Sequence, residues 1–490
     1  MKEIELKQTG SGGLESRFIK NGSFVHTTGN QFKIFPFKTN PSGDVFIVDF
    51  KSFQGIVGEL FRLTDRKTQL EVDTKGESYK TFLRNSIIDN AIKKVETKNQ
   101  EEFKTMLQNL FFEEDNSLIK FNVKTIYYMN FINPNNAIKD FAKFIIDIFL
   151  KDDTLMTSLK EKKENDNILH QLIVECLPEL SDVTSKSSPI QYSNLFPGIN
   201  DLFKADFSFL SNDVSFLLKH IEDLFKYYSF FYFTQVSLKL NNFGHGNTEV
   251  EPIFFSLDWE TLSESRLSAH IPGWKYLNKN FEQVFAHANA LELLNYIFID
   301  NQNVGDYHQI NSLYQSLNDE EKTVFKSKID SLNEFYTSHI TNFNTGASWD
   351  GCEINLQNAI KISKINEEFD LKLFSFWYRI KYQFENSPRY KPYFDYSKWL
   401  SSFSKVNYTK NRGRLGATTV ISQEMLLFLT RLCIGNESKI RLKTLWDNLK
   451  LRGIVFDETS KLEITKLFEK INLIEKKSDS GDAQYIKSTI

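Results

Sequence analysis

Hydrophobic residues recur at helical spacing three times within the last seventy or so residues of this 490-residue chain. A serine suited to an N-cap precedes the first run, and the third run has an acidic first turn. Two short strand-like segments follow, on either side of a Ser-Asp-Ser-Gly-Asp turn. Three helices and a hairpin predict a winged helix-turn-helix, with helices at 422–432, 438–451 and 457–471 and strands at 473–476 and 483–487.

Upstream of this module the periodicity is mostly helical. Glycines and short apolar segments indicate strands and loops over residues 1–50, whereas 79–177 and 281–345 have helical spacing. Residues 201–240 predict buried helices, and 254–257 predicts a buried strand. The aromatic run 227–233 would point all round such a helix, which favours core packing over a base-stacking platform.

These patterns predict a mainly α fold of α+β character: a multi-domain helical protein with a small mixed N-terminal segment and a C-terminal winged helix-turn-helix. The predicted units are a mixed and then helical domain at 1–180, a linker rich in Ser and Pro at 181–200, a central helical domain at 201–370 with short strands near 253–258, a basic aromatic neck at 371–416 and the winged helix at 417–490.

Composition narrows the protein class. With 41 % hydrophobic and 25 % charged residues, the chain is typical of a folded protein that is too long for a single core. The three cysteines, Cys176, Cys352 and Cys433, are far apart, which argues against a disulfide framework and a zinc site. No signal-peptide pattern and no bilayer-length apolar run are present. We therefore expect a cytoplasmic protein without membrane attachment.

Motifs for nucleotide or metal chemistry are weak. The glycine cluster at 10–13 lacks the Lys and hydroxyl residue of a P-loop, and no Gly-Lys pair occurs in the chain. Asp65 with Asp73-Thr74-Lys75 has the residue types of a restriction-nuclease metal site, but the spacing is too tight for two strands and favours a charged surface loop. We expect no intrinsic enzymatic activity, no catalytic residues, no metal and no cofactor.

The C-terminal region is basic in a slightly acidic chain. Residues 405–490 contain sixteen Lys and Arg against ten Asp and Glu, whereas the whole chain has a net charge of −3. The third predicted helix alternates lysine with glutamate and offers no Arg, Asn or Gln for bidentate base reading, so sequence-specific readout is not expected. Contact with DNA phosphates and docking onto another protein stay open as equal alternatives.

Between residues 374 and 414 cations alternate with aromatic side chains. Such interleaving suits phosphate contact combined with base stacking, and it equally suits packing of the C-terminal module onto the body. The candidate DNA-binding cations of the neck and the C-terminal module are Arg389, Lys391, Lys398, Lys405, Lys410, Arg412, Arg414, Lys461, Lys466, Lys470, Lys476 and Lys477.

A polar constellation follows the predicted strand at 254–257. Asp258 and Glu260 lie close in sequence to Arg266 and His270, and such groups can perform acid–base or metal chemistry. We favour a buried ion pair between a carboxylate and Arg266 that fixes a loop, because charged residues leaving a core are generally paired. The alternative is a metal-dependent nuclease that uses Asp258 and Glu260.

Four short motifs stand out in the C-terminal region: Gly413-Arg414-Leu415, Glu424-Met425-Leu426-Leu427-Phe428-Leu429, Arg452-Gly453 and Ser478-Asp479-Ser480-Gly481-Asp482-Ala483-Gln484-Tyr485. Together they resemble the DptG family, the G subunit of DNA phosphorothioation-dependent restriction systems. A second patch, Ser256-Leu257-Asp258-Trp259-Glu260 with Ser263 and Ser265-Arg266, is similar to the middle region of that family.

The resemblance implies a role in bacterial anti-phage defence beside two partner subunits, an ATPase and a helicase-like protein. Such systems attack DNA that lacks the sulfur-for-oxygen backbone modification, and the resemblance assigns no catalytic residue to this chain. We therefore expect a non-catalytic scaffold that also serves as an adaptor contacting double-stranded DNA. A pure protein-interaction scaffold without DNA contact is the further alternative.

Overall fold

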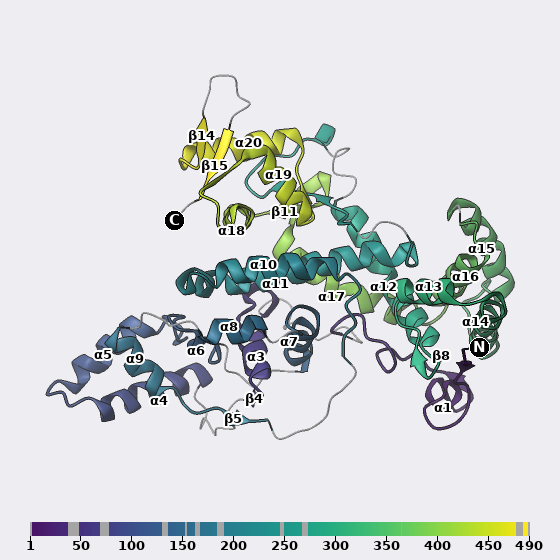
Figure 1. The fold of residues 1–490 in the computed structure, drawn as a ribbon, viewed down its shortest axis with the longest axis horizontal. Helices are drawn as coiled ribbons and strands as arrows, with labels where there is room; N and C mark the ends of the chain where they lie inside the picture. Colours follow the sequence, from purple (N-terminus) through teal and green to yellow (C-terminus); the bar gives the residue numbers. More distant parts are fainter. Residues whose placement is uncertain are drawn as a thin grey trace.

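The molecule is mainly helical, as predicted, with several small sheets. A computed structural model describes residues 2–37, 49–68, 78–129, 136–151, 154–161, 167–183, 191–245, 249–266, 273–363, 365–476 and 484–488. Figure 1 shows the long helix α11 (Val214–Lys239) crossing the middle of the molecule, with the C-terminal elements on one side and the N-terminal helices on the other. Among the described residues, no helix combines the length and the apolar character that crossing a membrane requires.

The helices span most of the described chain, and those between residues 79 and 176 lie within the region that the sequence predicted as helical. They are α1 (Leu14–Phe18), α3 (Gln54–Thr64), α4 (Tyr79–Lys94), α5 (Gln100–Phe111), α6 (Val123–Ile126), α7 (Asn136–Phe149), α8 (Thr154–Glu161), α9 (Ile168–Cys176), α10 (Gly198–Leu210), α11, α12 (Trp274–Leu294), α13 (Tyr307–Ser316), α14 (Asp319–Ser338), α15 (Trp349–Ser363), α16 (Glu368–Glu385), α17 (Tyr390–Tyr408), α18 (Gln423–Ile434), α19 (Leu442–Leu451) and α20 (Glu458–Lys470), with 3-10 turns η1 (Leu240–Asn242) and η3 (Gly413–Leu415).

The strands are short and pair over long sequence distances. They are β1 (Ile4–Leu6), β2 (Ile19–Lys20), β3 (Ser23–Phe24), β4 (Lys67–Thr68), β5 (Ser181–Asp182), β6 (Ile253–Phe254), β7 (Ser256–Leu257), β8 (Ile297–Ile299), β9 (Gln302–Asn303), β10 (Thr409–Asn411), β11 (Ala417–Ile421), β12 (Lys439–Arg441), β13 (Ile454–Val455), β14 (Ile474–Lys476) and β15 (Gln484–Lys487). The three-stranded sheets have the orders β1-β8-β9, β10-β11-β7 and β12-β15-β14, and the two-stranded ones are β13-β6, β2-β3 and β4-β5.

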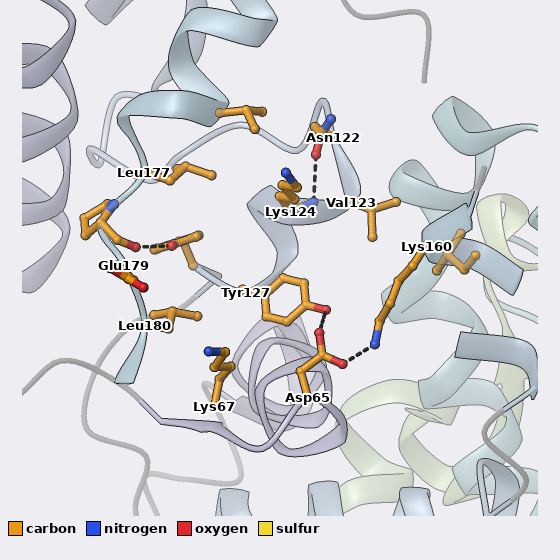
Figure 2. Close-up of a pocket in the computed structure, with 14 residues that line it drawn as sticks. Asp65, Lys67, Asn122, Val123, Lys124, Tyr127, Lys160, Leu177, Glu179 and Leu180 are labelled. Atoms are coloured by element: carbon orange, nitrogen blue, oxygen red, sulfur yellow. Dashed lines mark hydrogen bonds and ion pairs between the residues drawn. The ribbon is translucent and has the colours of Figure 1, made fainter. Parts of the chain in front are cut away.

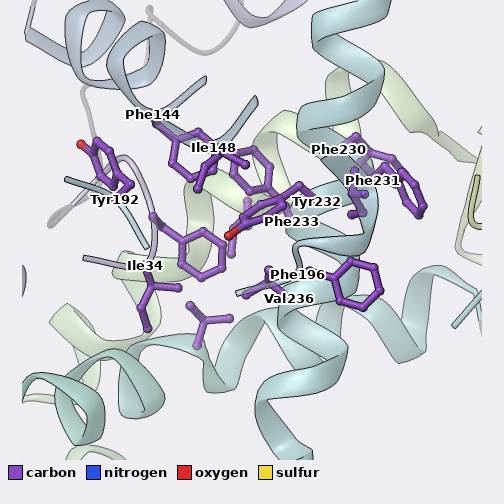
Figure 3. Packing of buried hydrophobic residues seen from close by; sticks show 14 of the residues in the cluster. Ile34, Phe144, Ile148, Tyr192, Phe196, Phe230, Phe231, Tyr232, Phe233 and Val236 are labelled. Carbon is purple, nitrogen blue, oxygen red and sulfur yellow. The ribbon is translucent and has the colours of Figure 1, made fainter. Parts of the chain in front are cut away.

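Helix α11 is the centre of the main core. The side chain of Asp213 caps it by accepting a hydrogen bond from the backbone N–H of Phe216. Every residue of the aromatic run 227–233 on α11 is buried, which confirms the prediction of core packing. The ring of Phe233 packs edge-on against Trp399 at 5.0 Å. It also stacks on Phe144 at 5.3 Å, and Figure 3 shows these two phenylalanines in the core.

The main core is continuous across the predicted units. Its buried residues come from the N-terminal segment, from α10 and α11, from the central helices and from the C-terminal elements. Tyr192 and Phe196, in the predicted linker 181–200, also belong to it, and residues 184–190 of that linker lie outside the described chain. A separate, smaller cluster joins α4, α5 and α9, which form the lobe at the lower left of Figure 1.

The C-terminal elements follow the predicted order with one correction. Helices α18, α19 and α20 and strands β14 and β15 occupy the predicted segments. The predicted second helix at 438–451 is wrong in its first turn: residues 439–441 form strand β12, which pairs antiparallel with β15. Backbone hydrogen bonds to β15 therefore replace the first helical turn.

The predicted strand at 254–257 is in fact two strands that pair with different C-terminal partners. β6 runs parallel to β13, and β7 runs parallel to β11. Phe255 lies buried between them, and its N–H donates to the carbonyl oxygen of Val455 at 2.9 Å. The C-terminal elements are thereby joined to the centre of the chain by shared sheets.

Two further differences lie in regions that the sequence predicted as a single type of structure. Helix α1 forms inside the N-terminal segment predicted as strand and loop, and strands β8 and β9 interrupt the predicted helical region 281–345. β8 exists because it pairs with β1, roughly 290 residues earlier in the chain. A pairing of that range leaves no local signal in the sequence.

Candidate nucleic-acid interface

Part of the predicted polar constellation assembles at the junction between the centre of the chain and α20. The carboxylate of Glu260 accepts hydrogen bonds from the Leu257 N–H at 2.8 Å, the Ser460 hydroxyl at 2.8 Å and Arg266 Nη2 at 3.0 Å. Arg266 also holds both carboxylate oxygens of Asp457, each at 2.8 Å. The ion pair between Glu260 and Arg266 that the sequence led us to favour is therefore present.

This ion-pair cluster positions the first turn of α20. Asp457 is the N-cap of α20, and its side chain accepts the Ser460 N–H at 2.8 Å. The side chains of Glu260 and Arg266 are 3 % and 14 % exposed. The charges are thus shielded from water and matched by hydrogen bonds, which is the arrangement of a structural ion pair.

The other members of the constellation do not join that cluster. Asp258 is half-buried, and burial raises the pKa of its carboxyl group above the ordinary value. Lys410 donates to the backbone carbonyl of Asp258, and His270 lies outside the described residues. Among the described residues, no group of three or more His, Cys, Asp or Glu is arranged to hold a metal ion.

Arg412 is one of the candidate DNA-binding cations, and the structure shows it binding the protein itself. Its Nη1 donates to the carbonyl oxygen of Glu260, and its Nη2 donates to that of Leu257, both at 2.6 Å. Its Nε also donates to the hydroxyl of Thr418 at 3.2 Å. The guanidinium group therefore satisfies carbonyl oxygens at and just beyond the end of β7. The neighbouring Arg414 is exposed on η3.

A second buried ion pair, which sequence reasoning did not find, fixes the C-terminal elements on α10. Arg452 donates to the two carboxylate oxygens of Asp206 at 2.5 and 3.0 Å, and the Tyr228 hydroxyl donates to Asp206 at 2.6 Å. Burial raises the pKa of the adjacent Cys433 thiol to about 11. Gly453, at φ +81°, lies so close to Phe231 that an added Cβ would be 2.8 Å from the ring.

The candidate cations of α20 and the hairpin are distributed over the surface of the C-terminal unit. Lys461 and Lys466 each form an ion pair at 2.7 Å with a glutamate three residues earlier, Glu458 and Glu463. Lys470 is exposed at the end of α20. Lys476 ends β14, and Lys477 lies outside the described residues.

In the predicted neck, buried aromatic residues alternate with exposed cations along α17. Tyr393, Tyr396, Trp399 and Tyr408 are buried in the main core, so they join α17 to the body and are not available for stacking. Lys391, Lys398, Lys405 and Lys410 are exposed, as is Arg389 just before α17. Sequence spacing did not show that the buried aromatics and the exposed lysines lie on different sides of one helix.

No protein-family model matches the chain, and the comparison with curated proteins finds no match. The resemblance to DptG therefore stays a prediction.

A cavity of about 740 Å³ is lined by Asp65 and Lys67, which follow α3, and by residues of α6, α8 and α9. Asp65 lines it, accepts a hydrogen bond from the Tyr127 hydroxyl and forms an ion pair with Lys160 (Figure 2). Burial raises the pKa of Tyr127, which keeps this hydroxyl protonated as the donor. Asp73, Thr74 and Lys75, the other residues of the nuclease-like pattern, lie outside the described residues.

Proposed function

We propose that this chain is a non-catalytic subunit of a phosphorothioation-dependent DNA restriction complex, in which its C-terminal unit is a winged helix that contacts DNA. The observation that carries the proposal is the order and pairing of the elements between Gln423 and Lys487. Helix α18 is followed by β12, α19, β13 and α20, and then by a hairpin whose strand β15 lies between β12 and β14. Three helices followed by a paired hairpin support the proposed winged helix-turn-helix.

The use of the carboxylates at the junction supports a non-catalytic role. Glu260 and Asp457 share Arg266, and Asp206 is held by Arg452 and Tyr228. Removing any of these charges would leave a buried partner without compensation, which assigns them to stability. The nuclease alternative would require Glu260 to leave three hydrogen bonds.

The charge pattern of α20 supports contact with the DNA backbone rather than with base edges. The helix carries lysines but no Arg, Asn or Gln, the residues that read bases by paired hydrogen bonds. Its lysines suit phosphate contacts, as does the exposed Arg414 on η3. In the cell, the partners that we propose are the ATPase and helicase-like subunits, within the cytoplasm.

One observation favours the second candidate, a scaffold that binds only protein. Leu462 lies on the outer side of α20 and is 62 % exposed, and Leu451 at the end of α19 is 57 % exposed. Leucine side chains exposed to this extent suit contact with a protein partner. Because the glutamates of α20 already pair with Lys461 and Lys466, this surface would also tolerate a partner of low charge.

Binding of the full-length chain to a labelled DNA duplex at several salt concentrations separates the two candidates. The full chain is required because β6 and β7 complete the C-terminal sheets. Release of counterions from about four phosphates predicts a slope of log K against log salt of about −3.6. The variant Lys466→Glu/Lys470→Glu should reduce the size of that slope by about 2, whereas Lys361→Glu on α15 should leave it unchanged.

The chain could fail to bind duplex DNA in a salt-dependent way and yet copurify with an ATPase and a helicase-like subunit. That result would favour the protein scaffold over the DNA adaptor. DNA cleavage by the purified chain that is lost in Glu260→Gln but retained in Arg266→Lys would contradict the non-catalytic role. Arg266→Lys serves as the matched control because it keeps a positive charge beside the carboxylates but loses the bidentate geometry.

A further inference from the structure

The outward face of α17 has an unusual composition. Among the side chains of this helix that the structure describes, the exposed ones are two aromatics and three lysines, namely Tyr390, Lys391, Phe394, Lys398 and Lys405. The acidic side chain Asp395 is only partly exposed and forms an ion pair with Lys398. The exposed set is therefore aromatic and cationic, with no exposed carboxylate.

These five residues, which we call the α17 ridge, lie on one side of the helix. At 3.6 residues per turn their directions fall within a sector of about 100°, and the ridge runs about 22 Å from Tyr390 to Lys405. The opposite side of α17 carries buried residues, among them Trp399 and Phe403, that pack in the main core. One side of the helix is thus packed in the core, and the ridge faces solvent.

The two aromatic rings of the ridge form a stacked pair. The ring centroids of Tyr390 and Phe394 are 6.2 Å apart, with planes 14° from parallel, and the residues are 51 % and 40 % exposed. The ammonium group of Lys398 lies 5.1 Å from the centre of the Phe394 ring. Near-parallel exposed rings beside ammonium groups offer flat apolar surface and positive charge within one short segment.

The charges around the ridge are positive in sum. Arg389 is exposed directly before Tyr390, and Glu385, at the end of α16, is paired with Lys381 at 2.7 Å. Lys391 and Lys405 form no ion pair with any residue that the structure describes. An anionic ligand would therefore meet cations whose charge the protein itself does not neutralise.

We propose that the α17 ridge binds a single strand of nucleic acid, with Tyr390 and Phe394 stacking on bases and Lys391, Lys398 and Lys405 contacting phosphates. A single strand is favoured over a duplex because the faces of duplex bases are already stacked on their neighbours, so exposed rings gain contacts only with unpaired bases. The inference rests on the proposed role in DNA restriction, where strand separation by a helicase-like partner would supply such a ligand.

The test is fluorescence anisotropy of the full-length chain with an oligo-deoxythymidine of about 15 nucleotides and, separately, with a duplex of the same length. The variant Tyr390→Ala/Phe394→Ala should weaken single-strand binding tenfold or more, because loss of each stacking ring typically weakens binding by that order. Its duplex affinity should stay unchanged. The conservative variant Tyr390→Phe/Phe394→Tyr should bind the single strand like the parent.

The variant Ile354→Ala/Ile362→Ala is a matched control, because it removes two apolar side chains from α15 that are even more exposed than Tyr390 and Phe394. It should leave single-strand binding unchanged. Parent-like single-strand affinity of Tyr390→Ala/Phe394→Ala would overturn the ridge as a stacking site, and so would copurification with a partner protein that this variant alone abolishes. Because the proposed duplex contact is tested through Lys466 and Lys470, either inference can fail while the other stands.

Discussion

The junction beside α20 and the α17 ridge contain similar residue types but use them in opposite ways. At the junction Arg266 and Arg412 donate to carboxylates and carbonyl oxygens of the chain itself, as does Arg452 beside α10. On the ridge, the ammonium groups of Lys391 and Lys405 are exposed and unpaired among the described residues. A cation whose donors are satisfied inside the fold maintains structure, whereas an unsatisfied one is available to a ligand.

The largest loss of stability is expected at the most deeply buried ion pair, Arg452 with Asp206. Arg452→Met should lower the free energy of unfolding by about 3–5 kcal/mol, because it leaves the Asp206 carboxylate buried without its partner. Urea denaturation of the full-length protein measures this change. Asp206→Leu/Arg452→Met should recover part of the loss; an unfolding midpoint of Arg452→Met equal to that of the parent would show that this ion pair does not maintain the fold.

A somewhat smaller loss of stability is expected at the less deeply buried cluster of Arg266, Glu260 and Asp457. Arg266→Ala should lower the free energy of unfolding by roughly 2–3 kcal/mol, because Glu260 and Asp457 then face each other without a cation. Arg266→Lys should recover only part of it, since an ammonium group cannot bind two carboxylates in the same fork geometry. If Arg266→Ala unfolds at the same urea concentration as the parent, the cluster does not fix the start of α20.

Buried satisfied groups should also make stability depend on pH. Burial lowers the pKa of His287 to about 3, and the neutral ring lies 3.1 Å from the Tyr307 hydroxyl and 3.0 Å from Asn241 Oδ1. As the pH falls below 6.5, the unfolded chain takes up a proton that the folded chain does not, so stability decreases until about pH 3. His287 alone is expected to contribute a loss of about 2 kcal/mol at pH 5 relative to pH 7.

His287→Gln should flatten this dependence, which urea denaturation at pH 7 and pH 5 can measure. The free energies of unfolding of parent and variant should converge as the pH is lowered, because only the parent loses the contribution of a neutral imidazole. Parallel curves for the two proteins would show that His287 does not contribute to the pH dependence.

The smallest effect on stability is expected on the ridge. Lys391→Glu/Lys398→Glu/Lys405→Glu should change the free energy of unfolding by no more than about 0.5 kcal/mol, because these side chains are exposed. The salt slope of single-strand binding should nevertheless fall in size by about 2. A large loss of stability in this variant would place the ridge with the junction as a structural feature and erase the contrast between the two regions.

Local signals in the sequence were sufficient for most helices and for the C-terminal hairpin. Ser422 and Asp457 cap α18 and α20 as their residue types indicate, and Gly453 follows α19. Long-range pairing was not predictable. Strand β12 forms at the start of a helical pattern only because β15 lies beside it, and the segment 253–257 divides because two partners pair with its two halves.

The candidate site was predictable in composition but not in orientation. The sequence indicated that cations and aromatics alternate in the neck, yet it did not show that Trp399 and Tyr408 are buried while Tyr390 and Phe394 are exposed. It also placed Arg412 among the DNA-binding candidates, although that side chain binds backbone carbonyls of the neighbouring strand. Which partner satisfies a charged group depends on tertiary contacts that spacing does not encode.

The sharing of strands β6 and β7 with β13 and β11 has a consequence for how the protein is made. Residues 253–257 leave the ribosome long before their partners, since β13 is synthesised roughly 200 residues later. At ordinary rates of translation that delay lasts about 10 to 40 s. Until residue 455 has emerged, the strand edges and the buried face around Phe255 have no cover, so this part of the nascent chain is where chaperones are expected to bind.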